Sequence, residues 1–283
     1  MRDRDAPGAD APGGDVPGGD VPGADAPDPT ATRLEYFACG ETGHDMGLLT
    51  RGGARGRRVF PSGAFLWTSA TRRVLFDTGY APLPWRAGPA AWAYRRLLPP
   101  TVPAGATIAE QVDPATVTHV VLSHLHPDHV GGLRSFPHAT LVLSEGLART
   151  LGRPRLLDGV LRRLLPDGFD VGRATVVSDF AEGPFGLRVA DPFHDDRYLL
   201  VDLPGHARGH LGALVEGRVV LAGDAAWGRD LLGQEARLRA VPRLVAHDGA
   251  AQARTARSLL AAERSGARLL LAHDPHPTRT DLL

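Results

Sequence analysis

The chain has 283 residues, of which 43% are hydrophobic and 23% are charged, and its formal net charge at pH 7 is zero. This length suits one large globular domain or two small ones, and the balanced charge gives no indication of a nucleic-acid or anionic-membrane partner. No run of about 18 apolar residues predicts a transmembrane helix, and no apolar signal core is present, so we expect a cytoplasmic protein. The single cysteine, Cys39, excludes an internal disulfide and a thiolate metal cage. We interpret it as a small buried residue rather than a nucleophile.

The N-terminal segment is repetitive. Residues 6–25 read APGAD, APGGD, VPGGD and VPGAD in succession. Proline, glycine and aspartate dominate this stretch, so it cannot form a hydrophobic face. We therefore predict a disordered tail over residues 1–32 and a single folded domain over residues 33–283.

Short apolar runs bounded by turn residues predict a series of strands. Gly63–Ser69 and Arg73–Asp77 flank Ala70-Thr71 and are typical of a hairpin, and Glu216-Gly217 marks a second hairpin. The other predicted strands are His119–Ser123, Thr140–Ser144, Tyr198–Leu203, Leu211–Val215, Arg218–Ala222 and Arg268–Ala272.

Helices are expected between the strands. Ala250–Arg264 has the composition of a helix, with Gly266 as its stop. Leu147–Leu151 and Leu156–Leu165 are shorter candidates. Strand-rich halves with interspersed helices favour two sheets that pack together and are covered by helices.

Residues 81–103 show no clear period and contain Trp85, Trp92 and several prolines. A long connection of this kind is often functional. One interpretation is a flap over a substrate, which would place Trp85 and Trp92 in the substrate pocket. The other is a surface excursion with its own small apolar cluster.

The strongest chemical signal is SHLHPDH at residues 123–129, directly after the apolar run HVVL. His124 and His126 are two residues apart and can face the same way on an extended backbone. Asp128 and His129 follow as the chain turns. Imidazoles and carboxylates are ligands of zinc and related metals. These four donors could serve two adjacent ions but could not complete both coordination shells.

More donors follow at the ends of later predicted strands. His206 and His210 lie in PGHARGH, Asp224 lies in AGD, and His273 lies in AHD. Asp77, in FDTG, also ends a predicted strand. The spacing of the motif alone does not decide between His206 and His210 as the ligand.

With these motifs in this order, the chain resembles the metallo-β-lactamase-fold superfamily of metallohydrolases from about Tyr36 to His273. The resemblance implies an α/β architecture, an αββα sandwich of two mixed β-sheets flanked by helices, with metals at one edge. It also implies two Zn²⁺ ions, with Fe or Mn as other metals that such sites take. The implied ligands are His124, His126 and His210 for one ion, Asp128, His129 and His273 for the other, and Asp224 as the bridge. His206 and Asp77 would then support these ligands from outside, Asp77 as a hydrogen-bond acceptor.

Such a site would be hydrolytic. Two ions roughly 3.5–4 Å apart lower the pKa of a shared water to about 7 and supply a hydroxide that bridges them. Asp128 is a candidate proton shuttle, and Asp224, as the bridging carboxylate, belongs with it among the candidate catalytic residues. A cysteine at position 224 would indicate true β-lactamases. The sequence has no GxSxG motif for a serine nucleophile.

Within the superfamily, FPSGAFLWTSATRRVLFDTGY, SHLHPDHVGG and AGDAAW most resemble the N-acyl-homoserine lactonase group. That resemblance implies a small-molecule lactone or other ester as substrate. Trp227 stands where those lactonases carry a tyrosine, so it is either a hydrogen-bond donor or an apolar wall of the pocket. Two alternatives are a glyoxalase II-like thioester hydrolase and a non-catalytic metal-binding scaffold. An oligomer is compatible with the sequence.

Overall fold

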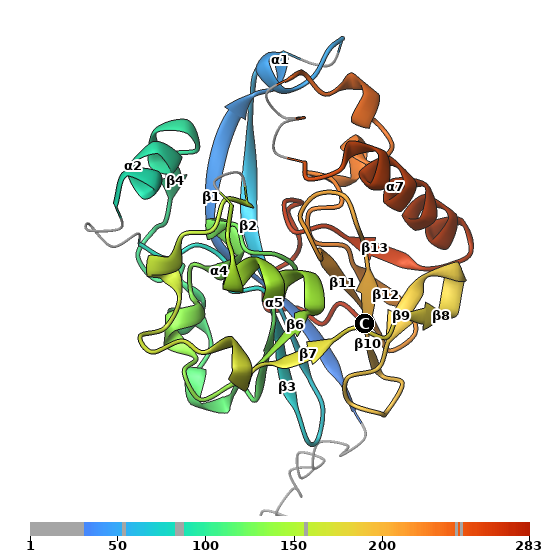
Figure 1. The fold of residues 1–283 in the computed structure, drawn as a ribbon. Helices are drawn as coiled ribbons and strands as arrows, with labels where there is room; N and C mark the ends of the chain where they lie inside the picture. Colours follow the sequence, from blue (N-terminus) through green and yellow to red (C-terminus); the bar gives the residue numbers. More distant parts are fainter. Residues whose placement is uncertain (1–30, 53–54, 83–87, 156–157, 241–242, 244–245) are drawn as a thin grey trace, which may run out of the picture.

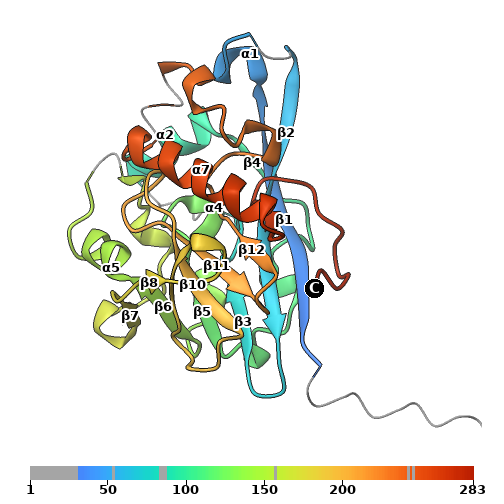
Figure 2. The same cartoon turned by 90° about the vertical axis from the view of Figure 1, so that its right-hand side faces the viewer.

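The computed structural model describes residues 31–52, 55–82, 88–155, 158–240, 243 and 246–283. Two β-sheets face each other and helices lie on their outer sides (Figure 1, Figure 2). The predicted αββα sandwich of two mixed sheets is therefore confirmed. Residues 1–30 of the predicted tail lie outside the described residues, and the first strand begins at Arg33.

The first sheet has seven strands in the order β4-β1-β2-β3-β5-β6-β7. Its first four strands pair antiparallel, whereas β3, β5, β6 and β7 pair parallel, so the sheet is mixed. The strands are β1 (Arg33–Asp45), β2 (Arg57–Thr68), β3 (Arg73–Phe76), β4 (Pro100–Thr101), β5 (His119–Val121), β6 (Thr140–Ser144) and β7 (Thr175–Val177).

The second sheet has six strands in the order β13-β12-β11-β10-β9-β8. It is antiparallel except for the parallel pair β12–β13. The strands are β8 (Ala181–Glu182), β9 (Arg188–Ala190), β10 (Tyr198–Asp202), β11 (Leu211–Val215), β12 (Val219–Leu221) and β13 (Arg268–Leu270).

Six α-helices accompany the sheets in the described part of the chain. They are α1 (Met46–Leu49), α2 (Gly88–Leu97), α3 (Ile108–Gln111), α4 (Pro127–Val130), α5 (Glu145–Gly152) and α7 (Gly249–Arg264). The longest of them, α7, has 16 residues. Over the described ranges, no helix combines the length and the apolar character that crossing a membrane would require.

Along a strand, buried side chains pack alternately into two different clusters, because successive side chains point to opposite faces of the sheet. On β10, Tyr198 and Leu200 join the large cluster between the sheets, which includes Trp67. Leu199 and Val201 point the other way and pack with residues of α7 such as Leu259. The second sheet is therefore buried on both faces, as the apolar sequences of its central strands require.

Both predicted hairpins are confirmed. Thr68 pairs with Arg73 at the end of the β2–β3 hairpin. In the β11–β12 hairpin, Glu216 and Gly217 both have positive φ, at 50° and 60°. Positive φ at both central residues is the mark of a type I′ turn, whose twist matches that of the flanking strands.

Two expectations from the sequence need correction. The prediction of a helix at Leu156–Leu165 is wrong for the described residues, which form no α-helix there, although Arg162–Leu164 forms a 3₁₀ helix. Gly159 has a φ of 65°, a left-handed conformation that stops a helix. Residues 81–103 are also more regular than expected, since they contain the ten-residue helix α2.

Trp67 gives a direct test of the core. Trp67 is 0% exposed, and the centroid of its ring lies 5.5 Å from that of Tyr198. Its Nε1 donates to Glu216 Oε1 at 3.1 Å. We expect Trp67→Ala to lower the free energy of unfolding by about 3–5 kcal/mol, because it empties a closely packed site. Trp92 is 70% exposed, so Trp92→Ala should change the stability by less than about 0.5 kcal/mol. Guanidinium chloride unfolding measures both, and similar losses for the two variants would contradict this account of the core.

Candidate metal centre

The predicted donors converge at one edge of the sandwich, where several strands end. His124 lies three residues beyond the end of β5, and Asp128 and His129 lie in the short helix α4. His206 follows β10, Asp224 follows β12 and His273 follows β13. The two sheets thus deliver their donors to a common point, and three groups of these residues are placed so that they could hold a metal ion.

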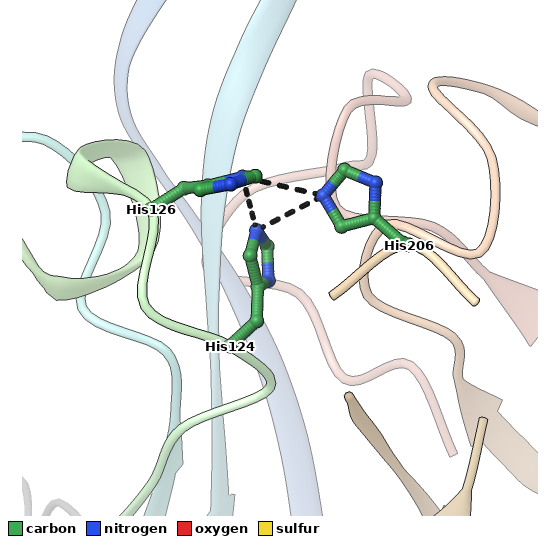
Figure 3. Close-up of side chains that lie close together, drawn as sticks. All are labelled: His124, His126 and His206. Carbon is green, nitrogen blue, oxygen red and sulfur yellow. Dashed lines mark hydrogen bonds between the residues drawn. The ribbon is translucent and has the colours of Figure 1, made fainter. Parts of the chain in front are cut away.

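Three imidazoles form the first group (Figure 3). His124 Nε2 lies 2.9 Å from His126 Nδ1, and His206 Nε2 lies 3.2 Å and 3.3 Å from these two atoms. Nitrogens that bind one zinc tetrahedrally at about 2.0–2.1 Å stand about 3.3 Å apart. Burial holds the pKa of His124 and of His206 well below the usual range. Both rings are therefore neutral and have lone pairs that can bind a cation.

A second group contains Asp128, His129 and His273. Asp128 Oδ2 lies 3.8 Å from His129 Nε2 and 3.6 Å from His273 Nε2. Asp224 lies between the two groups. Its Oδ1 is 3.2 Å from His129 Nε2, and its Oδ2 is 3.1 Å from His273 Nε2 and 3.5 Å from His206 Nε2. Asp224 is thus placed to touch cations held by either group.

The electrostatics of this second group fit a cation. Burial opposes a charge on His129, but Asp224, Asp77 and Asp128 outweigh it and hold its pKa well above the usual value. Burial likewise opposes a charge on His273, but Asp224 outweighs it and raises the pKa of His273 to about 9. Apart from their 3.2 Å contact with each other, His129 Nε2 and Asp224 Oδ1 are also buried without a hydrogen-bond partner. Buried polar atoms are normally satisfied, so this pair of atoms and the surplus of carboxylates fit a divalent cation.

Asp77 connects β3 to the ligand loop, residues 123–129, which carries His124, His126 and His129. Its Oδ1 accepts from the Ser123 backbone at 2.7 Å, and its Oδ2 accepts from Ser123 Oγ and His129 Nδ1 at 2.7 Å and 2.8 Å. Donation from Nδ1 leaves Nε2 of His129 free to bind a metal. Asp77 itself is fully buried with a φ of 60°, a conformation that aspartate tolerates better than most residues.

Other backbone contacts fix the remaining donors. His273 Nδ1 donates to Pro61 O at 2.7 Å, which directs its Nε2 into the site. Ser62 Oγ donates to the backbone carbonyl of Asp128 at 2.5 Å. A Cβ on Gly131 would lie only 2.6 Å from Ala81 N, so the ligand loop can pack this closely on the segment after β3 only with glycine there.

The structure reverses the expected roles of His206 and His210. His210 Nδ1 donates to Leu203 O at 2.9 Å, and its Nε2 accepts from the Asp224 backbone at 3.1 Å. Both ring nitrogens are therefore used, and no lone pair remains for a metal. His206 takes the place beside His124 and His126. His210 instead positions the loop that carries Asp224.

A cavity of about 400 Å³ opens over the metal centre. Its floor contains His126, Asp128, His206, Asp224 and His273, and Trp227 is in its wall, as the sequence predicts. The placement of Trp92 in the pocket is wrong, because Trp92 is absent from the cavity lining and its side chain points to solvent. Trp85 lies outside the described residues.

The cavity has other lining residues that the sequence did not indicate. Its apolar part comes from Leu49, Phe60, Leu97, Leu98 and Pro127, and its polar part outside the metal centre includes Thr42, His44, Tyr80 and Tyr94. These residues come from β1, α1, β2, α4, the residues after β3 and the segment that contains α2. Phe60, Tyr80 and Pro127 lie within the motifs quoted above, but nothing in those motifs marks them as cavity residues, since only the fold brings them together.

The reversed assignment can be tested by metal analysis. We expect His206→Ala to reduce the bound metal by about one ion per chain, because three protein donors are the usual minimum for such an ion. His210→Ala should keep the full metal content at saturating zinc, with an affinity weaker by about 10–100-fold, as is typical for a supporting partner. Elemental analysis after gel filtration and competition with a chromophoric chelator would measure both quantities. A full complement in His206→Ala, together with a lost ion in His210→Ala, would restore the original assignment.

Comparisons with known proteins identify relatives of this chain. The N-acyl homoserine lactonase AttM of Azorhizobium caulinodans is 31% identical over 178 residues, which are 58% of this chain and 60% of the relative. Metallo-beta-lactamase domain-containing protein 1 of Homo sapiens is 35% identical over 182 residues, 62% of this chain and 53% of the relative. The chain thus aligns with between half and three fifths of the length of these curated relatives.

Solved structures show the same fold. An N-acyl homoserine lactone hydrolase with N-hexanoyl-L-homoserine at its catalytic metal center aligns with a TM-score of 0.65 at 17% identity, over 87% of this chain and 94% of that one. The dizinc quorum-quenching lactonase AidC aligns with a TM-score of 0.63 at 13% identity, over 88% and 90%. Residues 57–273 match the family model of the metallo-beta-lactamase superfamily. The chain therefore belongs to the metallo-β-lactamase superfamily.

Proposed function

We propose that the protein is a metal-dependent hydrolase that opens a lactone or cleaves another carboxylic ester. The observation that carries the proposal is the cavity, whose floor is a buried cluster of histidines and aspartates and whose walls are mostly apolar. The names of the relatives support it, since AttM is described as a lactonase and the Mycobacterium tuberculosis relative as a probable metallo-hydrolase. Zinc is the metal we propose, because imidazole and carboxylate donors suit it.

The proposed ligands divide into two sets that share Asp224. His124, His126 and His206 would hold one ion, and Asp128, His129 and His273 would hold the other. Bound divalent ions of this kind polarise a substrate carbonyl and make water nucleophilic near neutral pH. The protein's own part is to keep the donor atoms fixed, through Asp77 and His210, so that little reorganisation is needed during the reaction.

Asp128 is the residue we propose for proton transfer. It lines the cavity, and its side chain is 13% exposed, whereas that of Asp224 is 3% exposed. A carboxylate at the cavity surface can take a proton from the attacking water and deliver it to the leaving alkoxide. Asp224 also lines the cavity, but it is more deeply buried, and we assign it to holding the cations.

The cavity walls favour an uncharged substrate with an apolar acyl group. Phe60, Leu98 and Trp227 offer apolar surface near the cluster, and each buried CH₂ of an acyl chain contributes about 0.8 kcal/mol. No arginine belongs to the described lining of this cavity. This favours a neutral ester over a thioester whose carrier has a phosphate or carboxylate tail.

Chelation and substitution test the proposal. We expect the zinc-loaded protein to hydrolyse N-acyl lactones or aryl esters, and to lose this turnover when the metal is removed by a chelator and regain it when zinc is restored. Asp224→Ala and His126→Ala should lose metal and turnover together, since each removes a donor from the cluster. Trp92→Ala, on the solvent side of α2, is the matched control and should keep both.

The outcomes separate the candidate functions. Stoichiometric zinc without turnover of any lactone, ester or thioester would identify a binding scaffold. Turnover of thioesters alone would favour the glyoxalase II-like activity. Full turnover in Asp224→Ala after exhaustive chelation would exclude the metal-dependent mechanism itself.

A further inference from the structure

Two tyrosines meet at the cavity. Tyr80 follows β3, and Tyr94 lies on α2. Their hydroxyl oxygens are 2.8 Å apart, and both residues line the cavity together with Asp128 and Asp224. They come from the two ends of a segment that contributes no donor to the metal centre.

One hydroxyl hydrogen of the tyrosine pair is not used in a hydrogen bond between the two residues. Each hydroxyl carries one hydrogen, and the bond between the two oxygens uses only one of them. Neither hydroxyl has another hydrogen bond among the described residues. Thr42, the other hydroxyl of the cavity, differs because it donates to Pro99 O at 3.3 Å. The tyrosine pair therefore has one hydrogen available for a ligand.

Both hydroxyls remain protonated. Burial raises the pKa of Tyr80 and of Tyr94 well above the usual range, and the negative charge of Asp128 raises both further. The pair can therefore act as a neutral donor but not as a base. Tyr80 is buried and Tyr94 is half-buried in the lining of the same cavity that contains Asp128. A donor in such a partly desolvated place makes a stronger hydrogen bond than it would in water.

We propose that the Tyr80–Tyr94 pair donates its unused hydrogen bond to the carbonyl oxygen of the bound ester. Tyr80 is 1% exposed and anchored in the core, so it fixes the position of the Tyr94 hydroxyl. The pair thereby selects a ligand with a carbonyl group and sets its orientation over Asp128. This inference rests on the proposed function for the class of ligand, but the contact itself is testable without turnover.

The test uses two unreactive probes and the zinc-loaded protein. One probe is a five-membered lactam that carries an octanamide chain, and the other is a cyclopentane ring with the same chain and no ring carbonyl. Their difference in Kd isolates the contact to the ring carbonyl, because the acyl chain is common to both. Isothermal titration calorimetry would measure both probes with the wild type, Tyr80→Phe, Tyr94→Phe and the double variant.

We expect the double variant to bind the lactam about tenfold more weakly, as for the loss of one net hydrogen bond. The Kd of the carbonyl-free probe should change less than about twofold, because the apolar rings remain. Each single variant retains one hydroxyl, so its loss should be smaller. Tyr198→Phe is the control, since Tyr198 is buried outside the cavity, and should leave both Kd values unchanged.

Equal losses for the two probes, or no loss for the lactam, would overturn the inference. So would a wild type that binds the lactam no more tightly than the carbonyl-free probe. Unchanged zinc content and melting temperature in the variants exclude a structural effect, and Tyr94→Phe alone carries the test if substitution at the core residue Tyr80 prevents folding. A protein that shows the expected difference in binding but hydrolyses no ester would support this contact and refute the proposed function.

Discussion

The candidate metal centre depends on one buried carboxylate, Asp77. Its two oxygens accept three hydrogen bonds, from the backbone and hydroxyl of Ser123 and from the His129 ring. These bonds join the end of the β2–β3 hairpin to the loop that carries the HxHxDH motif. Because a buried charge must be compensated, the carboxylate holds that loop in one position. The left-handed backbone at Asp77 is a strain of the kind that a protein keeps where geometry matters for function.

The rest of the centre is held from the second sheet and α7. Thr255, on α7, donates to Pro204 O at 2.6 Å, and the backbone of His247 donates to His206 O at 2.9 Å. Gly205 lies against the first turn of the helix, where a Cβ would be 2.2 Å from Gln252 N. The loop that carries His206 is thus packed on the start of α7, while His124 and His126 are held from the first sheet. The donors of the candidate metal centre come together only when both halves of the sandwich are assembled.

Much of this arrangement could be predicted from the sequence, because it follows from local patterns. Apolar runs marked the strands, and donors at strand ends indicated a common edge. The choice between His206 and His210 could not be predicted, since both follow the same strand within one turn. It is decided by Leu203 O and the Asp224 backbone, which are contacts that spacing does not encode. The helix α2 could not be predicted either, because the glycine and prolines around it obscure its period. Nor could the contact of Tyr94 with Tyr80, which lies 14 positions away in the sequence.

The floor of the cavity and part of its wall are supported by different parts of the fold. The groups that would carry out the chemistry are fixed by two sheets, where almost any change disturbs the core. Tyr94, Leu97 and Leu98, by contrast, come from the excursion between β3 and β5, on or just after the helix α2, in which Ala91 is the one buried residue. Evolution can therefore reshape this excursion, and with it the choice of substrate, while the reactive machinery stays intact. Directed evolution of new specificities would do best to vary this region first.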